Sequence, residues 1–303
     1  MSFVWSALDA FHELLDTHGD PRMKGYPLMD TPWPTFALMV TYIFGVKYFG
    51  PKLMEKRKPF ELKRVLIFYN LVEIVISIIA LYEAYVVGWF THYSWRCQPI
   101  DRSDTPLNRR LVRGVWLYYI SKFIELFDTI FFVMRKKNDQ VSKLHVYHHS
   151  IMPFNTWVTA KFLPGGHATF GGVLNSFVHV IMYTYYLLAA LGPSMRKYLW
   201  WKKYLTVLQM GQFVFIFFHA MQPLFIDCDF PRPYAYFTLF QAGVFLILFK
   251  NFYDNAYEDG TQKVAVTATR TDDSEICSKE EKPHQENMAT RKRKATSKVE
   301  ASR

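Results

Sequence analysis

The sequence predicts an all-α membrane protein that crosses the bilayer seven times. Half of the 303 residues are hydrophobic, and they gather in runs close to the roughly 20 residues that a membrane-spanning helix needs. Basic residues fall between these runs rather than along one polar face, which argues against a partner made of nucleic acid. Three cysteines are too few for a disulfide-rich secreted scaffold or for a zinc site built from four cysteines.

The expected spans, in chain order, are residues 34–51, 65–87, 113–134, 144–163, 168–190, 203–222 and 234–254. The second, sixth and seventh are clear apolar runs. The first is short and carries Lys47 near one end, where the side chain can reach the membrane interface. The fourth is rich in histidine, and we retain it because without it the basic cluster at 196–203 would lie on the wrong side of the membrane.

Charge sets the expected orientation. Lys and Arg concentrate in the segments after the first, third and fifth spans, so these segments are expected in the cytosol and the N-terminus outside it. From residue 250 onward, 11 basic and 10 acidic residues accompany few apolar ones, a composition that cannot form a core. The expected organisation is a non-cytosolic segment at 1–33, a seven-helix catalytic domain at 34–254 and a disordered cytosolic tail at 255–303.

The third expected span contains three ionisable residues, and such residues inside a membrane usually mark a functional site. Lys122, Glu125 and Asp128 are spaced by three, so they follow one face of a helix and can pair with each other or with a neighbouring helix. A buried stack of ion pairs that only locks helix packing is the competing interpretation.

The next three spans also carry polar stripes. In the fourth, three histidines at i, i+3 and i+4 share one face, and the fifth and sixth each repeat polar residues on one side. These side chains are His145, His148, His149, Asn175, His179, Gln209 and Gln212. Their depths overlap in the cytosolic half, which predicts a polar site open to the cytosol and an apolar tunnel running deeper.

Two kinds of enzyme chemistry and one non-enzymatic role are compatible with these residues. The H-x-x-H-H spacing is typical of the iron-binding boxes of membrane desaturases and hydroxylases, but too few of the ten histidines lie in spans for a two-iron centre. A single metal bound by three or four histidines, in a lipid oxidase or desaturase-like enzyme, stays possible. The second enzyme chemistry is metal-free acyl transfer, and the non-enzymatic role is that of a lipid carrier.

Five motifs in order favour acyl transfer, and the other two roles are kept as alternatives. They are GPKLMEKRKPF at 50–60, KFIELFDT at 122–129, LHVYHHS at 144–150, NSFVHVIMYTYY at 175–186 and YLTVLQMGQ at 204–212. With them the chain resembles the very-long-chain fatty-acid elongases of the ELO family, the condensing enzymes of the endoplasmic reticulum, over about residues 25–260. The resemblance implies six helices around a narrow tunnel, with the first helix packed outside them.

The resemblance also implies the reaction and its setting. The enzyme would condense a long-chain acyl-CoA with malonyl-CoA, releasing CO2 and CoA and giving a 3-oxoacyl-CoA, without a metal or cofactor. It would lie in the endoplasmic reticulum membrane with its N-terminus in the lumen and its C-terminus in the cytosol. Expected partners are the two CoA substrates, membrane lipid, other enzymes of the elongation cycle and a further copy of the chain.

A histidine is the expected nucleophile, because soluble condensing enzymes use a cysteine thiolate and the three cysteines here fall outside the spans. The family pattern favours His148, with His145 or His149 orienting it and His179 facing it as acid, base or electrostatic partner. Lys122 and Asn175 are candidates to stabilise an oxyanion or enolate. Two carboxylates are expected to position Lys122 and the helices, and they are Glu125 and Asp128.

Two further sets of residues complete the predicted site. Basic and polar residues at the cytosolic mouth are expected to bind the phosphates of CoA, although they could serve only to fix topology; they are Arg135, Lys137, Gln140 and Lys202. Tyr185, Thr206 and Gln209 are expected along the pantetheine path. Cys97 and Cys228 fall in two loops on the non-cytosolic side, an oxidising compartment, which predicts a disulfide between them.

Overall fold

The computed structural model describes residues 2–258, and the regular secondary structure in this part of the chain is entirely helical, with no strand. Four helical stretches are long and apolar enough to cross a bilayer, namely Lys63–Val87, Gly166–Leu191, Lys202–Phe225 and Arg232–Tyr257. The protein is therefore an all-helical membrane protein with several spans. The description below concerns the compact unit formed by residues 1–250. Most of the predicted tail, 259–303, lies outside the described residues.

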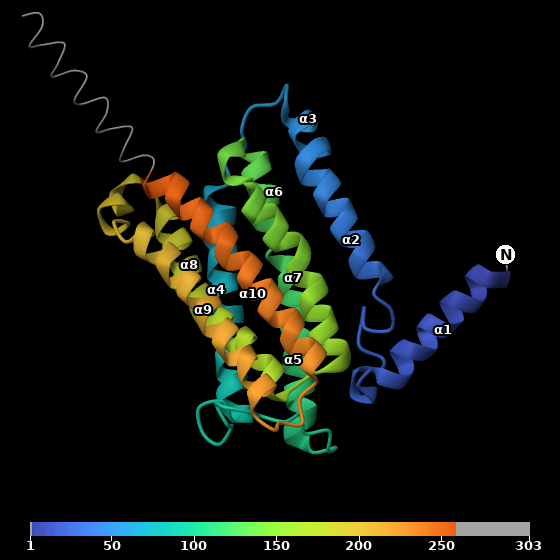
Figure 1. The fold of residues 1–303 in the computed structure, drawn as a ribbon. Helices are drawn as coiled ribbons and strands as arrows, with labels where there is room; N and C mark the ends of the chain where they lie inside the picture. The colour runs from blue at the N-terminus through green and yellow to red at the C-terminus, as the bar shows by residue number, and fades with distance from the viewer. Residues whose placement is uncertain (1, 259–303) are drawn as a thin grey trace, which may run out of the picture. The chain divides into compact units, whose positions relative to one another are not determined.

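Helices occupy every stretch predicted to span (Figure 1). The principal ones are α1 (Ser2–His18), α2 (Trp33–Phe44), α3 (Gly50–Met54), α4 (Lys63–Val87), α5 (Pro106–Ile124), α6 (Phe127–Met134), α7 (Lys143–Phe162), α8 (Phe170–Leu191), α9 (Lys202–Phe225) and α10 (Arg232–Tyr253). A π-helical turn, Gly45–Phe49, joins α2 to α3, so the first predicted span is one continuous helical stretch. The count of seven membrane crossings remains a prediction.

The third predicted span differs from expectation in two ways. Its helix, α5, begins at Pro106 rather than near residue 113, because the Thr105 side chain caps it by accepting the Asn108 amide hydrogen and Pro106 suits the first turn. Apolar content did not reveal this start, since arginines dominate the first two turns. The helix is also interrupted after Ile124 and resumes as α6 at Phe127.

The distribution of side chains on α4 is the reverse of that in a soluble protein. Its outward face exposes Phe68, Val75 and Ile78, whereas Asn70, Glu73 and Ser77 are buried. Because lipid is as apolar as these outward residues, a membrane helix can expose them and must enclose its polar groups. The polar interior of the unit therefore lies on the inner faces of its helices.

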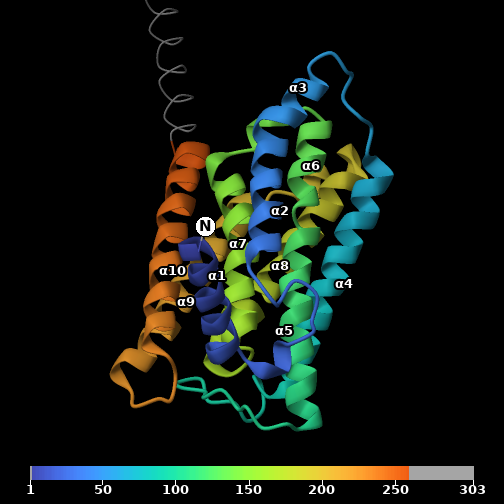
Figure 2. The same cartoon turned by 90° about the vertical axis from the view of Figure 1, so that its right-hand side faces the viewer.

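Six helices form a closed ring. α4 packs against α5 and α8, α5 packs against α7, and α8 packs against α9. The ring closes through α10, where the hydroxyls of Thr159 on α7 and Tyr234 lie 2.5 Å apart and the rings of Phe213 on α9 and Phe245 lie 5.1 Å apart. α2 lies outside this ring, against α7 (Figure 2).

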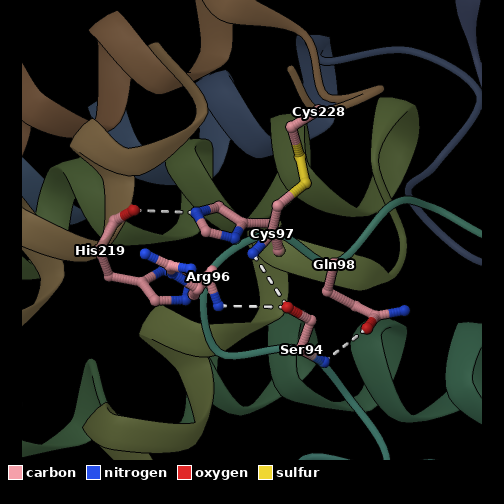
Figure 3. The surroundings of a disulfide bond; sticks show 7 residues. Ser94, Arg96, Cys97, Gln98, His219 and Cys228 are labelled. Carbon is pink, nitrogen blue, oxygen red and sulfur yellow. Dashed lines mark hydrogen bonds between the residues drawn. A yellow bond between two sulfur atoms is a disulfide. The ribbon is translucent and has the colours of Figure 1, made fainter. Parts of the chain in front are cut away.

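The two ends of the ring carry different connections. The basic segments before α4, between α6 and α7, and before α9 lie at one end, as Figure 1 shows. At the other end a disulfide joins Cys97, in the loop between α4 and α5, to Cys228, between α9 and α10, with their Cα atoms 6.0 Å apart (Figure 3). This is the pairing that the sequence predicts.

A buried carboxylate ties the N-terminal segment to this second end. Asp20 accepts hydrogen bonds from Arg22 Nε at 2.9 Å and Arg102 at 3.2 Å, and its backbone amide donates to the Lys161 carbonyl at 2.7 Å. Burial opposes ionisation, but the hydrogen bonds and charge of Arg22, with the charge of Arg102, hold the pKa of Asp20 below its ordinary value of 3.8. The carboxylate therefore stabilises the fold while it is ionised.

Replacing Asp20 by Asn tests this link. We expect D20N to lower the free energy of unfolding at pH 7 by about 2 kcal/mol, because a buried charge-assisted network loses its acceptor. A lowered folded-state pKa contributes stability above the unfolded-state pKa and loses it as pH falls through the folded-state value. The difference between wild type and D20N should therefore shrink below about pH 4.

Thermal unfolding in detergent across pH measures this difference. The exposed Asp30, changed to Asn, is the matched control and should leave stability unchanged. A D20N deficit that persists undiminished at about pH 2 would contradict the account.

Candidate active site

A cavity of about 400 Å³ occupies the centre of the ring. Its walls are side chains of α4, α5, α7, α8, α9 and α10 and of the short segments between these helices, and α2 contributes none among the described residues. Most of the lining is apolar, which is typical of a site for a lipid or another largely apolar ligand. The predicted site residues that line it are Lys122, Glu125, His148, Asn175, His179 and Gln212.

One wall holds a buried ion pair. Lys122 Nζ, in the last turn of α5, donates a hydrogen bond to Glu125 Oε1, and each residue is only 2% exposed. The ammonium group also donates to Asn175 Oδ1 on α8 at 3.1 Å and lies 4.3 Å from the centre of the Tyr118 ring. An ion pair out of water is stable only when such further contacts satisfy it.

α8 brings a second group to the same carboxylate. His179 Nδ1 lies 3.4 Å from Glu125 Oε1, and the His179 ring packs edge-on against Tyr183 with centroids 5.5 Å apart. Asn175 and His179 are one helical turn apart, so both reach the cavity from the same face of α8. Tyr118 also donates to Asn175 Oδ1 at 2.8 Å, which fixes that amide.

The three histidines of α7 are not equivalent. His148 lines the cavity and its ring packs against Phe245 at 5.3 Å between centroids. His149 is buried beside it, and the ring of His145 packs at a tilt against His149 with centroids 4.3 Å apart; neither residue lines the cavity. His145 Nε2 lies 2.8 Å from Thr129 Oγ1, so this ring is held by α6.

Asp128 is separated from the ion pair by the interruption between α5 and α6. Its carboxylate accepts a hydrogen bond from Tyr183 Oη on α8 at 2.9 Å. Asp128 is buried and does not line the cavity. The sequence allowed Asp128 to pair either within its own span or with a neighbouring helix. The structure has the second pairing, with α8.

The residues predicted to bind CoA lie away from the cavity. Arg135 is half-buried and Lys137, Gln140 and Lys202 are exposed, all near the ends of helices on the basic side of the ring. Of the predicted pantetheine path, Thr206 is buried and Tyr185 and Gln209 are half-buried. Gln209 Nε2 contacts Met182 Sδ at 3.3 Å, which places this part of α9 against α8.

Sequence reasoning missed several polar residues of the cavity. They are Glu73, Tyr118, Asn155, His167 and His219. Glu73 could have been predicted, because a carboxylate in the most apolar span indicates a functional site. Tyr118 gave none, because a tyrosine in an apolar helix most often only packs. Among residues 2–258, no three His, Cys, Asp or Glu side chains are grouped as ligands of one metal ion.

The ring of helices, its apolar cavity and the polar network at one wall are typical of a membrane protein with a site for a largely apolar ligand. Comparison with known proteins names the class. The model of the ELO family, described as GNS1/SUR4, matches residues 27–265. The chain therefore belongs to the ELO family, and its role is in fatty-acid elongation.

Individual relatives agree over most of the chain. A very long chain fatty acid elongase of Aedes aegypti is 52% identical over 269 residues, which cover 88% of this chain and 75% of the relative. Very long chain fatty acid elongase 7 of Drosophila melanogaster is 52% identical over 271 residues, covering 88% and 82%. Human very long chain fatty acid elongase 1 is 44% identical over 245 residues, covering 80% and 88%.

A double-mutant cycle tests the energetic role of the buried pair. E125Q leaves the Lys122 ammonium without an anionic partner, so we expect it to reduce the free energy of unfolding by about 3–5 kcal/mol. K122M combined with E125Q removes both charges and should recover more than half of that loss. K122M alone completes the cycle, and chemical denaturation in detergent measures all three variants.

The exposed Glu61, changed to Gln, is the matched control for loss of a carboxylate. If the single and double variants were equally unstable, the two charges would not stabilise one another in the fold.

Proposed function

We propose that this protein is the condensing enzyme of fatty-acid elongation. It joins a long-chain or very-long-chain acyl-CoA to malonyl-CoA and gives 3-oxoacyl-CoA, CO2 and CoA. Family membership supports a role in elongation, and the observation that carries the finer proposal is the position of His148. This ring lines an apolar cavity that also contains a lysine, a histidine and an amide held in fixed contacts.

The first half-reaction transfers the acyl group to the enzyme. A ring nitrogen of His148 attacks the thioester carbonyl carbon, the carbon–sulfur bond breaks, and CoA leaves with the proton that the imidazole loses. The product is an acyl-imidazole whose chain extends into the cavity. His145 and His149 act as positioning residues, because the His149 ring packs edge-on against His148 and the His145 ring packs against His149. Thr129 holds His145 in turn.

The second half-reaction forms the carbon–carbon bond. Malonyl-CoA loses CO2, and the electron pair of the broken bond attacks the acyl carbon while His148 leaves and regains a proton. Lys122 and Asn175 stabilise the negative charge on oxygen, a contribution worth about 3 kcal/mol for one well-placed donor. His179 supplies or accepts the proton, and Glu125 holds both Lys122 and His179 in place.

The substrates enter at the basic end of the ring. Arg135, Lys137, Gln140 and Lys202 bind the phosphates of CoA there, and the pantetheine arm passes Tyr185, Thr206 and Gln209. The proposed reaction uses the two CoA substrates alone, with no metal or cofactor. Its chemistry does not need the iron of a desaturase, and a covalent acyl intermediate separates it from a lipid carrier.

The proposed setting follows from charge and family. All seven helical stretches cross the endoplasmic reticulum membrane, six of them around the tunnel and the first outside, with the basic end and C-terminus in the cytosol and the N-terminus in the lumen. The disulfide-bonded end then lies in the oxidising lumen. The product needs further reduction and dehydration, so we propose association with the other enzymes of the cycle. A homo-oligomer is also proposed.

Mass spectrometry of the intact protein tests the covalent step. After incubation with acyl-CoA alone, we expect one acyl adduct on His148 and release of one equivalent of CoA. H148A should lose the adduct. H149A is the matched control, because its ring is adjacent in sequence but does not line the cavity; it should keep the adduct at a reduced rate. An adduct absent from the wild type, or unaffected in H148A, would refute the intermediate.

Kinetics test the CoA site separately. Replacing Arg135 and Lys202 together by Ala should raise KM for acyl-CoA about tenfold with little change in kcat, because the phosphate contacts are equal in the ground and transition states. The increase should diminish at high salt. K58A, which removes an exposed lysine at the same end, is the control; an equal rise in KM for K58A would mean that only general charge matters.

A further inference from the structure

The wall of the cavity is open at one place, between α4 and α5. Among the described residues that line the cavity, only Ile79 and Leu117 are exposed, with exposed fractions of 49% and 47%. Ile79 lies on α4 and Leu117 on α5, and these two helices are neighbours in the ring. Each side chain therefore reaches both the cavity and the outer surface of the ring. We call the place between them the lateral gap.

Small residues keep the lateral gap free of side chains. Ala80 on α4 and Gly114 on α5 also line the cavity. A Cβ at Gly114 would meet one atom of another helix within 4 Å among the described residues, Glu83 Cβ at 3.9 Å. No side chain of a neighbouring helix therefore fills the space in front of Gly114, and a larger residue at this position would stand in the gap.

An ion pair fixes the two helices on the side of the gap nearer the disulfide. Arg110 Nε donates to Glu83 Oε2 at 2.6 Å, and Arg110 Nη2 donates to Glu83 Oε1 at 3.0 Å. The guanidinium carbon also lies 5.5 Å from the centre of the Tyr82 ring. A two-point contact between arginine and a carboxylate fixes orientation as well as distance. The fold therefore sets the spacing of α4 and α5 beside the gap.

The lateral gap faces the hydrocarbon core of the membrane. Along α4, Ile79 lies about 24 Å from the start at Lys63 and about 12 Å from the end at Val87. α4 is also the most apolar of the four stretches that can cross a bilayer. Because the hydrocarbon core is about 30 Å thick, a position this far from both helix ends opens toward lipid chains rather than toward water.

The end of the cavity at the disulfide is closed by an aromatic stack. The ring centroids of His167 and His219 lie 3.8 Å apart, and Phe170 stacks on His219 at 3.8 Å. His167 is 4% exposed, and Trp89, which lines the same end, is 1% exposed. A chain that runs straight from the reacting groups therefore meets a wall at this stack.

The distance to the aromatic stack is short for a very long chain. His179 and Phe170 are nine residues apart on α8, about 14 Å along the helix. One leaflet of the hydrocarbon core, which the chain of an ordinary lipid spans, is already about 15 Å thick. A longer chain therefore does not fit straight between the reacting groups and the stack. Leu117 lies five residues before Lys122 on α5, about 8 Å along the helix, so the chain passes the lateral gap first.

We propose that the lateral gap is the exit through which the tail of a very long acyl chain leaves the cavity and enters the membrane lipid. This rests on the proposed function, in which the chain is held at His148. Lipid tails are as apolar as the lining of the cavity, so the chain keeps a favourable environment when it crosses the gap. A short cavity can then accept chains of different lengths, and the residues beside the gap determine how readily the longest ones fit.

Photolabelling locates the end of the chain in the wild-type protein. Acyl-CoA with a diazirine on its last carbon is bound to the protein in lipid vesicles and irradiated, and labelled peptides are mapped by mass spectrometry. Only adducts that excess unlabelled acyl-CoA suppresses are counted, because free acyl-CoA in the bilayer labels any outward helix face. A chain longer than the distance to the aromatic stack should label α4 and α5 beside Ile79 and Leu117. A shorter chain should label the interior of the cavity.

Two variants separate an exit at the gap from a chain that ends at the stack. G114L fills the gap, so it should lower the ratio of kcat/KM for a long chain to kcat/KM for a short chain about tenfold. A168L fills the closed end next to His167 and should keep the wild-type ratio. G243L is the matched control, because Gly243 lies outside the cavity lining and a Cβ there would meet no atom within 4 Å.

The outcomes distinguish this proposal from the proposed function. Labelling of His167 or Phe230 by the long chain, or a loss in A168L as large as that in G114L, would overturn the exit while elongation still supports the proposed function. If a variant does not fold, the photolabelling of the wild type decides. No suppressible adduct at any length, or failure to elongate any acyl-CoA, would instead refute the proposed function.

Discussion

The buried contact between Lys122 and Glu125 constrains the rest of the structure. A charged pair inside a membrane is costly unless neighbouring groups complete its hydrogen bonding. Asn175 and His179 meet this requirement from α8, which draws that helix to the end of α5. The same contacts place an ammonium group, an amide and an imidazole on one wall of the cavity, so the interaction that holds the helices also assembles the site.

The cavity has two ends with different chemistry. His148, His179 and the ion pair lie at one end, and an aromatic stack lies at the other. The apolar surface between them suits an acyl chain, because an apolar chain is more favourably placed against an apolar lining than in water. The disulfide closes the second end by joining the loops that follow α4 and α9. The cavity therefore lies between the buried ion pair at one end and the disulfide-bonded loops at the other.

Sequence patterns predicted the helices and the polar stripes well. The spacing of Lys122 and Glu125 predicted that they can pair. The distribution of positive charge predicted that the basic segments share one end. The interruption at Leu126 and the helix start at Thr105 were not predicted, because both depend on local hydrogen bonds rather than on apolar content.

The roles of single residues could not be predicted from the sequence where they depend on tertiary contacts. His148 and His149 are adjacent, and only packing against α10 shows which ring lines the cavity. His167 and His219 come from distant parts of the chain, so neither indicates the stack by itself. Helical periodicity places a side chain on a face, but the partner of that face comes from the assembled ring.

Product analysis with labelled malonyl-CoA tests the central claim most directly. Purified protein in vesicles receives a long-chain acyl-CoA and malonyl-CoA labelled in the carbons that are retained. The account predicts a labelled 3-oxoacyl-CoA two carbons longer than the substrate, with one CO2 released for each product. Release of CO2 without a longer chain, or no reaction with both substrates present, would contradict the assignment of condensation to this cavity.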